Sequence, residues 1–141
     1  MFEITKIGQY LIIAGVALFL AGLIQGVFIP FVKNSRMGLA GHLTAVQCGM
    51  ALCIFGIIWS LHDLPPFWES IAAFGSVAGY SFIWLGITIA SMTGASQALP
   101  IAGKGFSASR NSEIVVYTLE ITGVILSLLS GATLLLGLIF R

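Results

Sequence analysis

Charged residues are scarce in this chain. Of its 141 residues six are Lys or Arg and five are Asp or Glu, together 8% of the chain, whereas 58% are hydrophobic. A soluble domain carries about 25% charged residues. The scarcity of charge therefore excludes a soluble globular domain, and the lack of a basic tract argues against a nucleic-acid partner. We expect an integral membrane protein of the all-α class.

Cysteine and histidine are also few, with two of each. Cys48 and Cys53 lie in one apolar run, about 140° apart around a helix, so we expect no disulfide between them. Two cysteines and two histidines in unrelated places do not form the ligand pattern of a structural zinc site. Residues 1–6 have neither a basic n-region nor a cleavage site, so we expect the first helix to be retained and not removed as a signal peptide.

Long apolar runs are what the chain has instead of charge. Each run exceeds the roughly 20 residues that a helix needs to cross a bilayer core of about 30 Å. The runs cover residues 9–32, 38–61, 67–92 and 114–140. We predict one transmembrane domain of four antiparallel helices over residues 1–141, with both termini on one side. The long connection 94–112 has the composition of a lid, and an ordinary linker is an equal alternative.

Basic residues near the helix ends predict the orientation in the membrane. Four lie in the loops 33–37 and 94–112, against two near the chain termini. They are Lys33, Arg36, Lys104 and Arg110 on the first side, and Lys6 and Arg141 on the second. This excess places the two loops in the cytoplasm, and we expect a protein of the bacterial inner membrane.

Glycine is abundant, with 17 residues spaced along the apolar runs. Gly22–Gly26 and Gly75–Gly79 are GxxxG pairs, which let helix backbones approach closely in lipid. This pattern predicts a tight bundle. Because four tightly packed helices enclose little volume, a large ligand would fit more easily between subunits.

His42 is the strongest candidate for a site. It lies near the start of the second apolar run, where an ionisable group costs about 3 kcal/mol on insertion scales and usually faces a partner, a cavity or a ligand. Gly38, Ala45 and Gly49 lie at i−4, i+3 and i+7, on the same helix face. We therefore expect the imidazole to lie on an open helix surface of small residues, which a flat molecule could approach.

Two other groups of polar residues lie at membrane depth. Tyr80, Trp84 and Thr88 share one face of the third predicted helix and would line an aromatic pocket, or else pack in the ordinary way. Glu120 is costly at this depth unless it is neutral or hydrogen-bonded. We expect it to bond to another helix, with a direct role in the site as the alternative.

Four further residues have simpler interpretations. Gln25 and Gln47 are expected to hydrogen-bond across helices. His62 stands next to Asp63 in a polar hairpin at the membrane edge, so we expect it to be exposed to solvent. Cys53 is expected to be a small packing residue.

Several segments, in this order along the chain, resemble a known family. They are NSRMGLAGHL at 34–43, GM at 49–50, GIIW at 56–59 and PIAG at 100–103. Together they resemble the hydroxylaminobenzene mutases, which are small membrane enzymes, and more distantly styrene oxide isomerase. The resemblance covers nearly the whole chain, and its most specific part is RMGLxxHL combined with the later PIAG.

The resemblance implies a concrete site. The styrene oxide isomerase branch is a membrane-embedded homotrimer that holds haem b between neighbouring four-helix subunits. A histidine of the second helix is an axial iron ligand there, and His42 matches it. With His42 as ligand, Gly38, Ala45 and Gly49 are the residues expected to contact the haem. The implied reaction is an intramolecular rearrangement of a small lipophilic epoxide or aryl hydroxylamine, with ferric iron as a Lewis acid.

The chain departs from the family pattern six residues after the histidine, where the family usually has asparagine and this chain has Cys48. Cys48 points about 120° away from His42, so we expect it to face the haem or substrate of a neighbouring site. A thiol donates a weaker hydrogen bond than an amide and can ligate iron as a thiolate. The tyrosine of the styrene oxide branch aligns near Ile87, and Tyr80 is the candidate substitute. With Trp84 it would hold the aromatic ring of the substrate.

A second class of function stays open at the level of sequence. The chain would then be a non-catalytic membrane protein, with or without haem, that serves as a partner subunit or binds a small molecule. A cytochrome with two histidine ligands is not favoured, because no second histidine lies at membrane depth.

Overall fold

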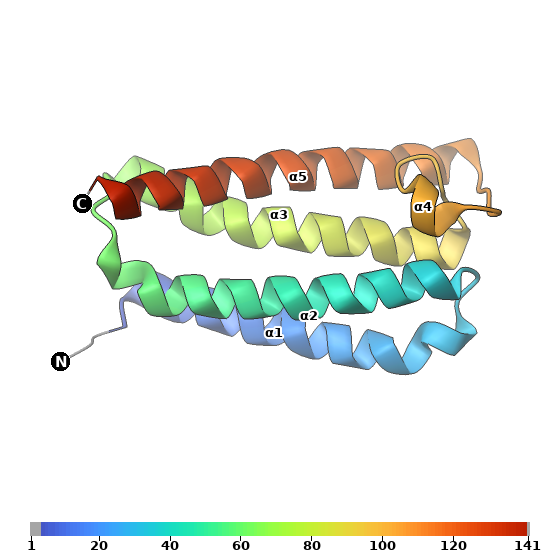
Figure 1. Cartoon of the computed structure of the whole chain (residues 1–141), viewed down its shortest axis with the longest axis horizontal. Helices are drawn as coiled ribbons and strands as arrows, with labels where there is room; N and C mark the ends of the chain where they lie inside the picture. Colours follow the sequence, from blue (N-terminus) through green and yellow to red (C-terminus); the bar gives the residue numbers. More distant parts are fainter. Residues whose placement is uncertain (1–3, 141) are drawn as a thin grey trace.

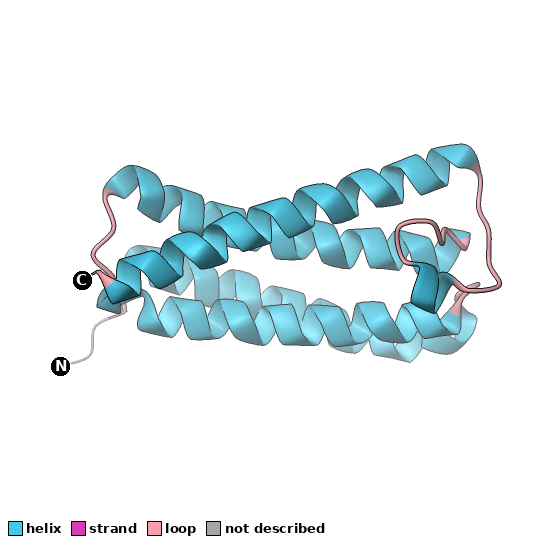
Figure 2. Cartoon of the chain, turned by 45° about the horizontal axis from the view of Figure 1, so that its top comes forward, coloured by secondary structure: helices cyan, strands magenta, loops and turns pink. Residues whose placement is uncertain are grey.

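The computed structural model describes residues 4–140, which are almost entirely helical and contain no strand (Figures 1 and 2). Four long helices follow one another in antiparallel order. They are α1 (Lys6–Phe28), α2 (Ser35–Ile58), α3 (Pro66–Thr93) and α5 (Arg110–Ile139). Short 3-10 turns extend α1 over Ile29–Phe31 and α2 over Trp59–Leu61, and a single-turn helix, α4 (Pro100–Gly103), lies in the last connection.

All four long helices are long and apolar enough to cross a membrane. The predicted all-α membrane fold is therefore confirmed, and the chain is an integral membrane protein. Arg141, one of the two basic residues assigned to the terminal side, lies outside the described residues.

Side-chain caps explain where three of the helices begin. In each case an oxygen of the residue before the helix accepts a hydrogen bond from a backbone N–H in the first turn. The pairs are Thr5 with Gly8, Asn34 with Met37 and Ser109 with Ser112, at 3.0, 3.1 and 3.3 Å. These starts differ from the predicted ones, 9, 38 and 114, because the prediction followed apolar runs and the capped first turns are more polar.

The helices pack as two pairs, α1 with α2 and α3 with α5, which meet mainly through α2 and α3 (Figure 1). One apolar cluster runs through the interior from Leu11 and Leu52 to Leu134. A second cluster, around Met37, Ile87 and other residues, lies toward the end of the molecule that carries α4.

Facing glycines bring α1 and α2 together. A Cβ on Gly8 would lie 2.5 Å from the carbonyl oxygen of Gly56, and one on Gly15 would lie 2.6 Å from that of Gly49. Neither helix can carry a side chain at these points, so the backbones are in direct contact. The predicted tight packing is confirmed at these pairs.

The GxxxG pair of α3 has a similar role toward α5. A Cβ on Gly75 would contact the hydroxyl of Ser130, and one on Gly79 would lie 2.5 Å from the hydroxyl of Ser127. Small residues on α3 therefore accommodate hydroxyl groups of α5 at the second close helix pair.

Asn34 joins the two segments that carry most of the family resemblance. It is fully buried at the start of α2, and its side-chain amide donates to the carbonyl oxygen of Ala102 in α4 at 2.9 Å. Its backbone N–H donates to the carbonyl oxygen of Ser91 at 3.0 Å. The segment around residue 34 and the PIAG segment therefore meet at one end of the molecule.

Charged residues complete this attachment. The ammonium of Lys33 donates to the carbonyl oxygens of Thr93 and Ser107 at 2.9 and 3.1 Å, and the guanidinium of Arg36 donates to that of Lys104. The connection after α3 is thus held against the first connection by hydrogen bonds. Both lie at the end opposite the termini (Figure 1).

Candidate functional site

His42 lies on α2 and faces α1. Its Nδ1 is 2.7 Å from the carbonyl oxygen of Gly22. A carbonyl oxygen only accepts, so Nδ1 donates, and in the neutral ring the lone pair is on Nε2. Within residues 4–140 we find no hydrogen bond to Nε2. Metal-ligating histidines commonly have this arrangement, with the second ring nitrogen donating to a carbonyl or carboxylate.

The expectation of an open surface of small residues beside His42 is wrong. Gly38, Ala45 and Gly49 do share a helix face, but all three are buried beneath α1 and the turn that follows it. A Cβ on Gly49 would lie 2.6 Å from the backbone nitrogen of Phe19. The helix periodicity identified the face correctly and could not show that a neighbouring helix fills it. Ala45 and Gly49 lie in the contact between α1 and α2, and Gly38 lies against the turn after α1.

The residues expected to be catalytic gather on the interior apolar cluster. Cys48, Tyr80 and Trp84 are all partly buried and pack against this cluster, to which all four long helices contribute. The ring centroids of Tyr80 and Phe55 are 6.4 Å apart. The structure therefore brings the three candidates onto one cluster, and Trp84 also reaches α1 through its hydrogen bond to Gln25.

A groove opens between α1 and α3 beside Trp84. It has a volume of about 470 Å³ and is lined mainly by apolar side chains, with Gln25, Thr88 and Ser91 as polar groups. Trp84 and Thr88 line this groove, which is one of the two alternatives for that helix face, whereas Tyr80 does not. Sequence reasoning missed Phe28, Phe31 and Met92, which complete the wall. Their apolar character at membrane depth gave no signal that separates a lining residue from a lipid-facing one.

The predictions for Gln25, Gln47 and Cys53 have different outcomes. Gln25 accepts a hydrogen bond from the indole N–H of Trp84 at 2.6 Å, which confirms a bond between helices. Gln47 is exposed, and we find no such bond for it among the described residues, so that prediction is wrong. The thiol of Cys53 lies 3.7 Å from the carbonyl oxygen of Ile12 and packs between α1 and α2.

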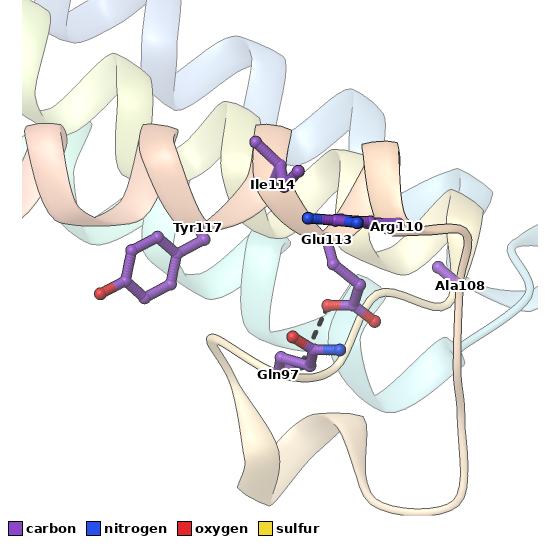
Figure 3. Close-up of a pocket in the computed structure, with 6 residues that line it drawn as sticks. All are labelled: Gln97, Ala108, Arg110, Glu113, Ile114 and Tyr117. Atoms are coloured by element: carbon purple, nitrogen blue, oxygen red, sulfur yellow. Dashed lines mark hydrogen bonds between the residues drawn. The ribbon is translucent and has the colours of Figure 1, made fainter.

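A second cavity, of about 520 Å³, lies between the start of α5 and the preceding connection (Figure 3). Arg110, Glu113 and Tyr117 line it together with Gln97. Glu113 is buried, and its carboxylate accepts hydrogen bonds from the backbone N–H groups of Ser96 and Gln97. The acid therefore holds the loop, and no residue of the expected site lines this cavity.

Glu120 is 8% exposed and lies over Gly86 of α3, where a Cβ would contact its carboxylate. Its Oε1 is buried and has no hydrogen-bond partner within the described part of the chain. The expected bond to another helix is therefore wrong, and the glycine on α3 provides space for the acid without a polar contact.

His62 is also not where sequence reasoning expected it. Its side chain is 4% exposed, and its ring packs edge-on against Trp59 at a centroid distance of 4.7 Å. Nδ1 accepts a hydrogen bond from the N–H of Leu64, and Nε2 is 3.9 Å from Oε1 of Glu69. Burial lowers the pKa of His62, and the negative charges of Glu69 and Asp63 partly oppose this effect.

The chain is similar to known proteins along most of its length. The family model for styrene oxide isomerase matches residues 7–139. Hydroxylaminobenzene mutase HabA of Ectopseudomonas oleovorans is 38% identical over 112 residues, which cover 78% of this chain and 83% of the relative. Hydroxylaminobenzene mutase HabB of the same organism is 35% identical over 111 residues, 77% of this chain and 67% of the relative. No solved structure matches. The chain therefore belongs to the styrene oxide isomerase family and is an enzyme of the isomerase and mutase type.

Proposed function

We propose that the chain is a haem-b isomerase that rearranges a small lipophilic epoxide or aryl hydroxylamine within the membrane. The observation that carries the haem assignment is the hydrogen bond from Nδ1 of His42 to Gly22, because it leaves Nε2 as the free ligand atom. The residues present therefore fit a haem held through His42. When bound, the ferric haem supplies a Lewis acid for the oxygen of the substrate.

The names of the relatives support the substrate class. Styrene oxide and hydroxylaminobenzene each combine one aromatic ring with a reactive oxygen. In this chain the groove between α1 and α3 offers aromatic side chains, Phe28, Phe31 and Trp84, for such a ring. Its apolar walls exclude water, which protects a rearranging substrate from hydrolysis. Cys48, Tyr80 and Trp84 pack on the same apolar cluster, and Cys48 and Tyr80 would tune the surroundings of the site.

We also propose a homotrimer. The four helices of one chain pack closely through facing glycines and leave little room for a macrocycle. The haem held through His42 would therefore lie between neighbouring copies. Native mass spectrometry of the haem-bound protein should give the mass of three chains, and a haem-bound monomer would contradict the proposal.

The proposed location is the bacterial inner membrane, with the α4 end in the cytoplasm. Lys33, Arg36, Lys104 and Arg110 all lie at that end. The exposed apolar side chains of the four long helices would face lipid acyl chains. Labelling of cysteines introduced into the α4 connection, from either side of sealed vesicles, tests this orientation.

His42→Ala tests the proposed function. The variant should insert and fold as the wild type does, but lack the Soret band and the turnover of styrene oxide or phenylhydroxylamine. His62→Gln is the matched control, because it removes the other imidazole and should keep both. A folded His42→Ala protein with its full Soret band would overturn the haem assignment.

The reaction type needs a separate measurement. An isomerase turns over without an electron donor or added oxygen. In an internal epoxide rearrangement the labelled oxygen stays in the product, whereas an aryl hydroxylamine can exchange its oxygen with water. A requirement for a continuous reductant or for oxygen would overturn the isomerase proposal for either substrate.

A further inference from the structure

His42 stands at the point where the contact between facing glycines of α1 and α2 ends. Gly56 and Gly49 of α2 each meet a glycine of α1, and the next residue at this heptad spacing is His42. A side chain as large as imidazole fits here because the opposing residue on α1 is Gly26. A Cβ on Gly26 would lie 3.0 Å from Nδ1 and 3.1 Å from Cε1 of the ring.

The space beside Gly26 differs from that beside the other glycines of α1. The three atoms nearest to its Cβ position all belong to the ring of His42, the third being Cγ at 3.6 Å. The atoms nearest to Gly8 and Gly15 are carbonyl oxygens of α2, and the atom nearest to Gly22 is Cβ of Ala45. Gly26 therefore makes room for the imidazole, whereas the other glycines make room for the α2 backbone and small side chains.

We propose that Gly22 and Gly26 form a niche that fixes the ring of His42 as an iron ligand, with Gly26 as a positioning residue. The carbonyl of Gly22 keeps the hydrogen on Nδ1, and the bare backbone at Gly26 sets the rotation of the ring. This inference rests on the haem site proposed above. It gives the Gly22–Gly26 pair a role in the site beyond helix packing.

Two constraints on one ring explain why both glycines matter. The bond to Gly22 is short, at 2.7 Å, so it fixes the tautomer and raises the electron density at Nε2. A hydrogen bond alone permits the ring to tilt about its acceptor. The Nδ1–Cε1 edge crowds the space that a Cβ on Gly26 would occupy, so the close fit of the ring over this glycine holds Nε2 in one direction.

Gly26→Ala tests the niche in the full-length, haem-loaded protein. The new methyl group would push the ring away from Gly22 and lengthen the hydrogen bond. We expect haem dissociation to become at least tenfold faster and the Soret maximum to move. Gly131→Ala is the matched control, because nothing lies within 4 Å of a Cβ on Gly131 and both measurements should stay unchanged.

A second measurement needs no haem, and its wild-type result does not depend on the folding of the variant. Nitrogen chemical shifts of His42 in the haem-free wild type should report the tautomer with hydrogen on Nδ1, and Gly26→Ala should shift this signal toward a mixture. A wild-type ring with hydrogen on Nε2 would overturn the niche even if the variant fails to fold. So would a folded Gly26→Ala protein with unchanged haem dissociation. Retention of haem by His42→Ala would instead overturn the haem site itself.

Discussion

At the residue scale, the two histidines of this chain use their ring nitrogens in opposite ways. Nδ1 of His42 donates to a carbonyl, whereas Nδ1 of His62 accepts from the backbone N–H of Leu64. In the neutral ring His42 therefore has its lone pair on Nε2, and His62 has its hydrogen there. Only His42 can bind a metal through Nε2 without first losing a hydrogen. The difference comes from the backbone groups beside each ring.

His62 gives a prediction on pH. Its lowered pKa in the folded protein means that the unfolded chain, with a pKa of about 6.5, takes up this proton first as the pH falls. The contribution of neutral His62 to the free energy of unfolding is thus complete above about pH 6.5 and is lost below it. Thermal unfolding in detergent from about pH 8 to about pH 5 should show this loss, and His62→Gln should lack it. Wild type that gains stability over the same range would contradict the prediction.

Cys48 gives a prediction on rate. Cys48→Asn places a stronger donor on the apolar cluster that also carries Tyr80 and Trp84, and introduces the residue that the family resemblance gives at this position. We expect the fold to persist and the rearrangement rate to change at least tenfold, which is about 1.4 kcal/mol in the barrier. Cys53→Ser is the matched control in the contact between α1 and α2 and should leave the rate unchanged. If Cys48→Asn alters neither the rate nor the haem spectrum, Cys48 is a packing residue.

At the scale of elements, α2 carries most of what distinguishes this chain. Its first turn is capped by Asn34, its middle bears His42 and Cys48, and its glycines fix its distance from α1. The helix is thus held at its N-terminus by the α4 connection and along its length by α1. A change in the first turn would be transmitted to His42 along a continuous helix.

Asn34 provides the prediction for this element. Asn34→Ala leaves the N–H of Met37 and the carbonyl of Ala102 without partners in a buried place, which should lower the free energy of unfolding by about 1–3 kcal/mol. Asn34→Ser keeps a capping oxygen but cannot reach Ala102. Hydrogen exchange should therefore increase around α4 in both variants, and in the first turn of α2 only with alanine. Equal hydrogen exchange of both regions in the two variants would show that the helix cap and the hydrogen bond to Ala102 are not separable.

How much of these elements the sequence could predict depends on how far apart along the chain the interacting residues lie. Four helices follow from four apolar runs, because the bilayer requires such lengths. The starts of α2 and α5 do not follow from these runs, because the side chains of Asn34 and Ser109 cap the helices before the apolar runs begin. The order in the α4 connection depends on a bond between Asn34 and Ala102, far apart in the sequence. His42 could be singled out by its depth alone, but its niche required knowledge of which residues of α1 face it.

At the scale of the whole molecule, the two halves of the proposed site are His42 and the groove beside Trp84. His42 faces α1, and Trp84 lines the groove between α1 and α3. In the proposed trimer each interface would join two different surfaces of neighbouring copies. His42 of one copy would then meet Trp84 of the next.

Mixed oligomers test this arrangement. His42→Ala lacks the proposed iron ligand, and Trp84→Ala lacks an aromatic side chain that lines the groove, so each variant should be inactive alone. If one site uses His42 of one copy and Trp84 of the next, random mixing in equal amounts restores intact sites at about a quarter of the wild-type number. Co-expressed and co-purified protein should then recover activity in this proportion. If both halves of a site belong to one chain, every site in the mixture carries a defect and activity stays at the level of the separate variants.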